Sequence, residues 1–180
     1  MPSLAELDAG LDAIRRAPRD AGRLELIVRR PAPGQREVVE LGQLDLHEGL
    51  VGDNWRARGN RHTPDGSADI NSQLTLMSSR AIALIAVDQS RWPLAGDQLF
   101  VDLDLSKENL PAGTRLAIGS AVVEVTAPPH LGCKLFANRY GVDAVKWVNS
   151  AIGKELRLRG LNARVVTPGT VRVGDVVHKV

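Results

Sequence analysis

The chain contains a single cysteine, Cys133, in a short segment whose neighbours can change its reactivity. His130 lies three residues before it and Lys134 directly after it. A thiol reacts as its thiolate, and nearby positive charge or a histidine favours that form. A free cysteine can equally be a small buried residue without chemistry. The spacing therefore makes Cys133 a candidate reactive thiol, with His130 and Lys134 as the groups that tune it.

Arginines form the second candidate group. In "ELRLRGLNARV" (residues 155–165), Arg157 and Arg159 alternate with leucines. On a strand, this alternation would place both guanidinium groups on one face, with Arg164 on a neighbouring segment. A guanidinium can hold phosphate or carboxylate through two parallel hydrogen bonds, so we expect the three arginines to bind an anion. An ordinary half-exposed strand would show the same alternation.

Acidic and amide side chains form the third group. In "FVDLDLSKENLPAG" (residues 100–113), Asp102 and Asp104 share one face of a predicted strand, and Glu108 and Asn109 follow. These groups can position a polar ligand or pair with the arginines, although a solvated strand face is the simpler alternative. The chain has no HxxxH or CxxC spacing, so a dedicated zinc site is not expected. The absence of a P-loop and of GxGxxG argues against nucleotide enzymes of those types.

A long polar segment, residues 56–72, shows no periodicity and carries three arginines and His62. A loop of this length inside a compact domain is usually functional or disordered. Two interpretations therefore stay open, a mobile surface loop and the rim of a site. We include His62 among the candidate cofactor-binding residues.

Three Gly-Asp pairs recur beside apolar runs: Gly52-Asp53, Gly96-Asp97 and Gly174-Asp175. Their simplest interpretation is turn chemistry, in which glycine takes a positive φ and aspartate accepts backbone amides. Asp53 also joins the candidate cofactor-binding residues.

The remaining pattern predicts the elements that must position these residues. From Leu24 to the C-terminus, short segments rich in Val and Leu alternate with period two and are separated by Gly, Pro, Asp or Asn. Such segments are predicted strands, and many short strands with glycine turns favour a barrel or a sandwich. Two predicted helices interrupt them, over residues 79–87, with Ser78 as N-cap, and over residues 142–152.

The N-terminus predicts a helix over Ser3–Ala17. Ser3 and Glu6 have the spacing of a capping box, apolar side chains recur on one helical face, and Pro18 ends the segment. The apolar face must be covered, either by the rest of the chain or by a second subunit.

Composition narrows the class of protein. The chain is 43% hydrophobic but only 3% aromatic, so the core must consist mainly of Val, Leu, Ile and Ala. A net charge of +2 is too small an excess to indicate a nucleic-acid partner. One cysteine excludes an internal disulfide framework. Neither a signal-peptide pattern nor an apolar run of about 18 residues occurs, so we expect a cytoplasmic protein without a membrane partner.

Taken in order, several segments resemble the MOSC domain, the C-terminal domain of molybdenum-cofactor sulfurases. They are "GLVGDNW", "QLTLMSSRAI", "ENLPAGTRLAIGSAVVEVT", the cysteine soon after that strand, and "RGLNARVVTPGTVRVGDVV". The resemblance covers roughly residues 24–180. It implies a mainly β fold, a closed barrel with a few peripheral α-helices over residues 23–180, preceded by a helix and linker over residues 1–22.

The resemblance also implies roles for particular residues. Cys133 matches the family cysteine, which carries sulfur as a persulfide or ligates molybdenum. Glu108 and Asn109 match the family's Glu-Asn pair. Two positions differ, because Gly132 replaces a frequent proline and Lys107 a usual glycine.

Full-length sulfurases add a pyridoxal-phosphate cysteine desulfurase domain, for which this chain has no room. A separate cysteine desulfurase is therefore the expected sulfur donor. Related stand-alone proteins reduce N-hydroxylated compounds using molybdenum cofactor, which would require a molybdoenzyme or electron-transfer partner.

The leading hypothesis is a molybdenum-cofactor-binding or sulfur-carrier protein, in which Arg157, Arg159 and Arg164 hold the pterin phosphate. The alternatives are a small-anion binding module in which Cys133 only packs, and a molybdenum-dependent reductase of N-hydroxylated compounds. A homo-oligomer formed through the N-terminal helix is a further expectation.

Overall fold

The computed structural model describes residues 1–180 and contains eleven strands. In chain order they are β1 (Gly22–Arg29), β2 (Glu37–Val39), β3 (Leu41–Asp45), β4 (Gly49–Leu50), β5 (Leu74–Ser78), β6 (Leu99–Asp102), β7 (Arg115–Ile118), β8 (Ala121–Pro129), β9 (Leu161–Thr167), β10 (Gly169–Arg172) and β11 (Val176–Lys179).

The helices are short. The α-helices are α1 (Leu4–Ala9), α2 (Leu11–Arg15), α3 (Trp55–Arg58), α4 (Ser79–Ala86), α5 (Lys134–Tyr140), α6 (Val142–Asn149) and α7 (Ala151–Glu155), and the 3₁₀-helices are η1 (Ile70–Ser72) and η2 (Gln89–Ala95). None of them combines the length and apolarity that crossing a membrane would need.

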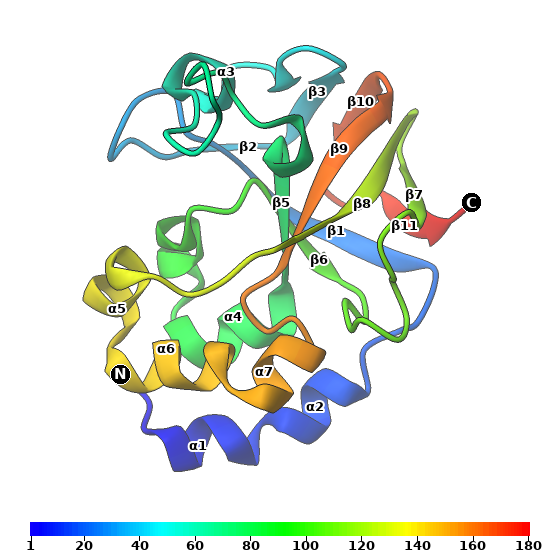
Figure 1. Cartoon of the computed structure of the whole chain (residues 1–180). Helices are drawn as coiled ribbons and strands as arrows, with labels where there is room; N and C mark the ends of the chain where they lie inside the picture. Colours follow the sequence, from blue (N-terminus) through cyan, green and yellow to red (C-terminus); the bar gives the residue numbers. More distant parts are fainter.

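Seven strands form a closed barrel in the order β1, β6, β5, β9, β8, β7 and β11, and β11 pairs with β1 to complete the ring (Figure 1). Every neighbouring pair is antiparallel except β5 with β6. Strand β2 pairs with β1 outside the ring, and β10, β3 and β4 form a separate small sheet. The closed, mainly antiparallel barrel predicted from the sequence is confirmed.

The barrel strands separate two hydrophobic cores. Successive side chains of a strand point to opposite faces, so Leu99 and Val101 of β6 lie in the barrel core while Phe100 lies in a second core outside it. The barrel core of 21 residues is entirely aliphatic. The second core holds five of the six aromatic residues of the chain: Trp92, Phe100, Phe136, Tyr140 and Trp147. Most aromatic side chains therefore pack between the helices and the outer face of the barrel.

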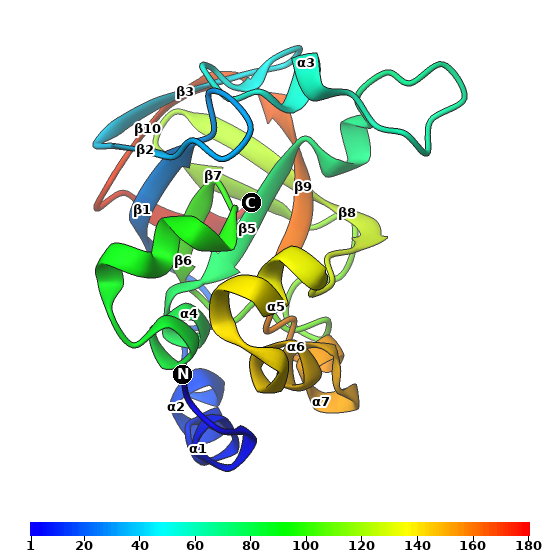
Figure 2. The same cartoon turned by 90° about the vertical axis from the view of Figure 1, so that its left-hand side faces the viewer.

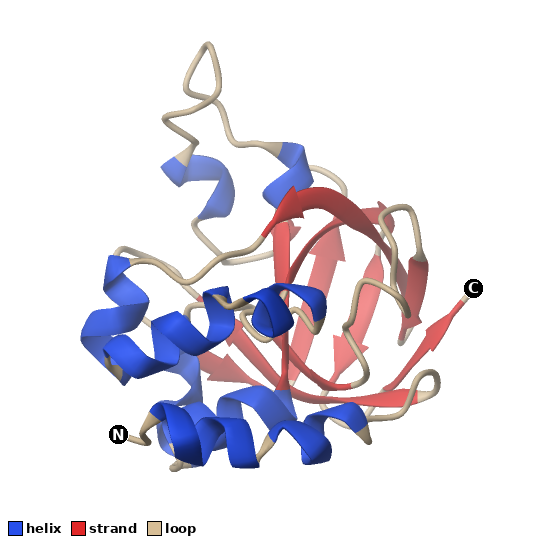
Figure 3. Cartoon of the chain, turned by 60° about the horizontal axis from the view of Figure 1, so that its bottom comes forward, coloured by secondary structure: helices blue, strands red, loops and turns tan.

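The helices α1, α2 and α4 to α7 gather on one side of the barrel (Figure 3). In two views, α1 and α2 lie beneath α4 and α6 (Figures 1 and 2). Their apolar face is buried there, since Leu7 is 1% exposed, and the indole of Trp147 donates to Asp8 at 3.0 Å. Leu7 and Ile14 of the predicted apolar stripe are therefore covered within the chain itself, whereas Leu4 is 39% exposed.

Two predicted helices are each divided in the structure. The first is interrupted at Gly10, where a Cβ would collide with the side chain of Leu84 on α4, so the close approach of α4 explains why a glycine stands at this position. The second is divided at Ser150, whose hydroxyl caps α7 by accepting from the amide of Gly153 at 3.0 Å. The predicted capping box of Ser3 and helix α4 with its Ser78 cap are both confirmed.

The predicted strand over residues 155–165 is wrong in its first half. Helix α7 extends to Glu155, and β9 begins only at Leu161. Between them the chain turns through positive φ angles at Arg157 (49°) and Gly160 (103°). Because residues 156–160 form a turn, Arg157 and Arg159 do not share a strand face.

Candidate functional site

The register of the barrel strands places residues that are distant in the sequence at the same height along the barrel. Leu99 of β6 pairs with Leu76 of β5, Leu76 pairs with Leu161 of β9, and Leu161 pairs with Pro129 of β8. The residues that precede β6 and β9 and follow β8 therefore lie close together. Three polar side chains meet there: Asp97, His130 and Arg159.

A cavity of about 510 Å³ opens beside this cluster. Five arginines line it: Arg30, Arg36, Arg58, Arg139 and Arg159. Cys133, His130 and Asn54 also lie in its wall. We call it the arginine cavity. Its wall contains no aspartate or glutamate, so the cationic groups face the cavity without a carboxylate among them.

Two of the arginines are held from behind by buried carboxylates. The side chain of Asp53, completely buried, accepts from Arg30 at both oxygens, Nε at 2.9 Å and Nη2 at 2.7 Å. It also accepts from the backbone amides of Arg30 and Trp55. A bidentate pair fixes both the position and the plane of a guanidinium, so Asp53 acts on the cavity through Arg30.

Asp97 holds the second arginine. Its fully buried carboxylate accepts from Arg159 Nη1 at 2.5 Å and lies 3.0 Å from His130 Nε2. Arg159 also donates to the carbonyl of Ala95 at 3.0 Å and stacks 4.8 Å from the ring centre of Phe136. Burial alone would raise the pKa of Asp97, but Arg159 and His130 outweigh it and hold that pKa well below its usual range.

The protonation of His130 follows from this arrangement. Burial and the charge of Arg159 lower the pKa of His130 in spite of the opposing attraction of Asp97, so the imidazole is neutral near pH 7. An ionised carboxylate can only accept hydrogen bonds. The proton therefore lies on Nε2, which donates to Asp97, and Nδ1 keeps a free lone pair.

The other three arginines have no carboxylate partner. Arg36 donates to the carbonyls of Pro93 (3.0 Å) and Gln35 (2.6 Å), Arg139 donates to a carbonyl of η2, and Arg58 lies at the rim. Burial and the neighbouring cations Arg139 and Arg30 lower the pKa of Arg36. Cations gathered with little counter-charge favour an anionic ligand, because the ligand relieves their mutual repulsion.

Cys133 is exposed and precedes the first residue of α5. The segment before it is fixed by Asn149 of α6, which accepts from the amide of Gly132 at 2.8 Å and donates to its carbonyl at 2.9 Å. These two hydrogen bonds hold the thiol-bearing residue at the cavity wall. Lys134 is exposed and does not line the cavity.

Family comparison identifies the fold and the protein class. The model of the MOSC domain family matches residues 70–178. The chain belongs to the MOSC domain family. This family is associated with molybdenum-cofactor binding. Among curated proteins, none matches this MOSC protein in sequence.

Solved structures share its fold. The YUAD protein from Bacillus subtilis superposes with a TM-score of 0.65 at 17% identity, covering 89% of this chain and 97% of that one. YiiM from Escherichia coli gives 0.56 at 19% identity, over 88% and 69%. YiiM from Geobacillus stearothermophilus gives 0.51 at 14% identity, over 89% and 73%. At these identities the likeness shows the fold alone.

The residues of the arginine cavity fit molybdenum cofactor. No cluster of three or more His, Cys, Asp or Glu side chains could hold a bare metal ion, so a metal would have to arrive with ligands of its own, as in a pterin cofactor. The arginines suit its phosphate, and a thiolate is a soft ligand for the metal. Two buried polar atoms of wall residues, Arg159 Nε and Asn54 Oδ1, have no hydrogen-bond partner and suit the polar edge of a pterin.

The structure gathers only some of the predicted site residues. Cys133, His130 and Arg159 line the arginine cavity, and Asp53 lies behind it. The others lie elsewhere: Arg164 pairs with Glu124, Glu108 with Arg19, Asn109 donates to the carbonyls of Arg19 and Asp104, His62 contacts Arg61, and Arg157 lines a different cavity.

The sequence pattern did not single out Arg30, Arg36, Arg58, Arg139 and Asp97 as site residues. Two of them carried a signal, since Arg58 lies in the polar segment 56–72, for which the rim of a site was one interpretation, and Asp97 lies in a Gly-Asp pair. Asp102 and Asp104, expected on one strand face, are also separated, because β6 ends at Asp102, which pairs with Arg80 at 2.6 Å.

Proposed function

We propose that this MOSC protein binds molybdenum cofactor in the arginine cavity, with Cys133 as the group that meets its metal or carries its sulfur. One observation carries the proposal: three arginines without carboxylate partners surround a cavity whose wall also holds the only cysteine and two buried, unpartnered polar atoms.

The side chains divide the work of binding. Arg36, Arg58 and Arg139 hold the phosphate and neutralise its charge. Arg159 and Asn54 use their unpartnered atoms for the polar edge of the pterin. When bound, the group would supply molybdenum redox or atom-transfer chemistry, and Cys133 contributes the one thiol in the cavity wall. His130 Nδ1 is the acceptor available for a proton at that wall.

A sulfur-carrier step can be written for the same thiol. The Cys133 thiolate attacks the terminal sulfur of a protein persulfide on a cysteine desulfurase. The S–S bond of the donor breaks, a new S–S bond forms on Cys133, and the donor cysteine leaves as its thiolate. Sulfane sulfur moves without net oxidation or reduction, so no further reagent is required.

The test is molybdenum and pterin analysis of protein isolated from its own host. Wild type should contain both. The double variant Arg36→Gln/Arg58→Gln should lose both, and Arg61→Gln, whose side chain lies outside the cavity, should keep them. If Cys133 meets the metal, Cys133→Ser should keep pterin but lose molybdenum. If Cys133 carries sulfur, treatment with a desulfurase and cysteine should add 32 Da to wild type and nothing to Cys133→Ser. Wild type free of pterin, molybdenum and added sulfur would refute the proposal.

A small-anion binding module is the second candidate. It is favoured by the arginines themselves, which suit an anion whether or not the thiol takes part. In that case inorganic phosphate should bind wild type and Cys133→Ser equally, and Arg36→Gln/Arg58→Gln should lose this binding. A host-isolated protein containing pterin would decide against it.

A further inference from the structure

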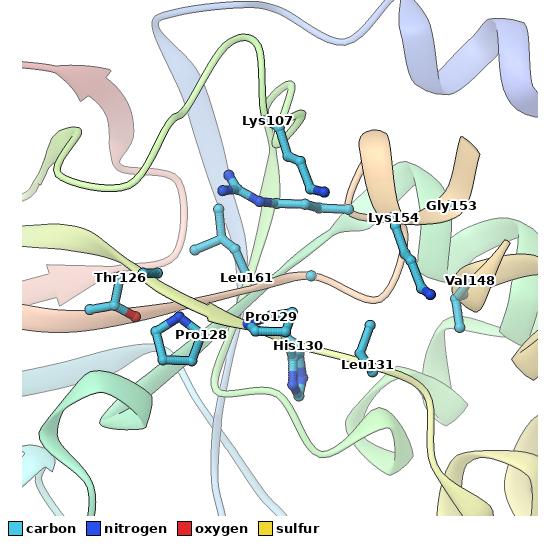
Figure 4. Close-up of a pocket in the computed structure, with 13 residues that line it drawn as sticks. Lys107, Thr126, Pro128, Pro129, His130, Leu131, Val148, Gly153, Lys154 and Leu161 are labelled. Atoms are coloured by element: carbon cyan, nitrogen blue, oxygen red, sulfur yellow. The ribbon is translucent and has the colours of Figure 1, made fainter. Parts of the chain in front are cut away.

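A second cavity, of about 400 Å³, lies against the other side of His130. Its charged side chains are three cations, Lys107, Lys154 and Arg157, and its wall again contains no aspartate or glutamate. We call it the lysine cavity. Figure 4 shows Lys107 and Lys154 among the residues that line it, together with His130. The lysine cavity is therefore a second cationic cavity, and its lining shares only His130 with that of the arginine cavity.

The three cations come from two segments. Lys107 lies in the loop after β6, whereas Lys154 near the end of α7 and Arg157 in the following turn are three residues apart. The backbone joins the two segments, since the amide of Lys107 donates to the carbonyl of Glu155 at 3.0 Å. Tertiary structure thus brings Lys107 to two cations that are neighbours in the sequence.

Arg157 is held without a counter-ion. Its Nη1 donates only to backbone carbonyls, at 2.6 Å to Leu110 and 3.2 Å to Leu105. Burial lowers the pKa of Arg157, although Glu155 nearby opposes this effect without forming an ion pair with it. A partly buried guanidinium anchored on neutral carbonyls keeps a full charge to offer to an anion.

The other wall of the cavity is apolar. Pro128, Pro129, Leu131, Val148 and Leu161 line it. Leu131 is 44% exposed, which is a large fraction for a leucine in a cavity wall and leaves apolar surface for a ligand to cover.

A β-bulge shapes that wall. Val125 pairs with Ala163 and Pro129 with Leu161, so three residues of β8 lie opposite the single residue Asn162 of β9. These three residues, Thr126, Ala127 and Pro128, all line the cavity. Bulges of this kind are common beside functional sites because they redirect side chains.

We propose that the lysine cavity binds a small organic anion, a monocarboxylate with an aliphatic or aromatic body. The carboxylate contacts Lys107, Lys154 and Arg157, and the body packs against Leu131, Val148 and the two prolines. A cavity of this volume suits a small ligand, since pockets for drug-sized ligands begin at about 300 Å³. The inference rests on this cavity alone and does not depend on the arginine cavity binding a cofactor.

Methyl NMR of the full chain tests the proposal with octanoate and benzoate as probes. Each should shift the methyl signals of Leu131, Val148 and Leu161 in a saturable manner, while the neutral octanol and benzamide should bind at least about tenfold more weakly, as expected for loss of a charge-assisted contact. The methyls of Leu135, in the wall of the arginine cavity, should change less.

The variant Lys107→Gln/Lys154→Gln should weaken both carboxylates about tenfold or more. Both lysines are exposed, so the fold should persist, which thermal melting checks. Lys146→Gln, an exposed lysine of α6 outside the cavity, should bind as wild type does. Equal binding of acid and amide, unchanged affinity in the double variant, or shifts confined to Leu135 would each overturn the proposal. None of these outcomes bears on pterin binding.

Discussion

The two cavities that meet at His130 hold their cations in different ways. In the arginine cavity, Arg30 and Arg159 are 8% and 6% exposed and are fixed by completely buried carboxylates. In the lysine cavity, Lys107 and Lys154 are exposed and have no side-chain partner in an ion pair. These two arginines are positioned before a ligand arrives, and the two lysines must be ordered by it.

This difference has a physical consequence for ligand choice. Ordering a lysine side chain costs about 1.5–2 kcal/mol of rotamer entropy, whereas a guanidinium already held by a carboxylate loses little on binding. The arginine cavity therefore suits a ligand of fixed shape, and the lysine cavity tolerates several. The preorganisation has its own cost, because it requires buried charges that must remain paired.

The strongest way to break the comparison is to remove a buried carboxylate. Asp97→Ala leaves Arg159 buried without its partner, so the free energy of unfolding should fall by about 3–5 kcal/mol. Urea denaturation followed by circular dichroism measures this loss. Lys107→Gln, in the other cavity, should change the same quantity by no more than about 0.5 kcal/mol. A loss below 1 kcal/mol for Asp97→Ala would mean that the arginine cavity is not held in place by this pair.

Acidification provides a graded test of the same cluster. Unfolded His130 takes up a proton near pH 6.5, but its folded pKa is lower. The unfolded state therefore binds more protons below pH 6.5, and stability should fall as pH decreases through this range, by at most about 1.4 kcal/mol per pH unit. The folded pKa of Asp97 is also lowered, so its contribution is present above about pH 4 and is lost at more acidic pH.

Urea denaturation at pH 7, 6 and 5 measures this slope. His130→Gln should flatten the decline between pH 6.5 and 5 and leave the steeper loss at lower pH that comes from Asp97. If His130→Gln keeps the wild-type slope, the neutral form of His130 is not what the fold stabilises.

The smallest expected change in the free energy of unfolding concerns the arginines that have no carboxylate partner. Arg36→Gln and Arg58→Gln remove cations without carboxylate partners, so each should change the free energy of unfolding by no more than about 0.5 kcal/mol, or raise it slightly. Differential scanning calorimetry should show that phosphate stabilises wild type and that both variants lose this effect. Arg159→Gln, in contrast, should destabilise the protein without any ligand. Equal destabilisation by all three changes would remove the distinction.

Local sequence signals predicted part of the site. Gly52, Gly96 and Gly174 all take the positive φ that the Gly-Asp pairs indicated, between 89° and 97°. Helix α4 begins after its Ser78 cap as predicted. The spacing of His130 and Cys133 placed both in one loop, and both line one cavity. These features depend on neighbours within a few residues, which a sequence displays directly.

The wrong prediction of a strand at residues 155–160 has a physical cause. The alternation of Leu and Arg over residues 156–159 fits a strand as well as the turn that the chain forms, and Leu158 is buried in that turn as a leucine on the inner face of a strand would be. Arg157 and Arg159 consequently enter different cavities.

By itself, the sequence determined a fold of short strands through period-two patterns and glycine turns, with the closed barrel implied by the family resemblance, and it singled out Cys133 as a candidate reactive thiol. Only the tertiary structure decided what surrounds that thiol. Asp97 and Arg159 are 62 residues apart, and Asp53 and Arg30 are 23 apart. Pairing across such distances depends on barrel register and on the cost of leaving a buried charge unpaired, and neither leaves a local pattern in the sequence.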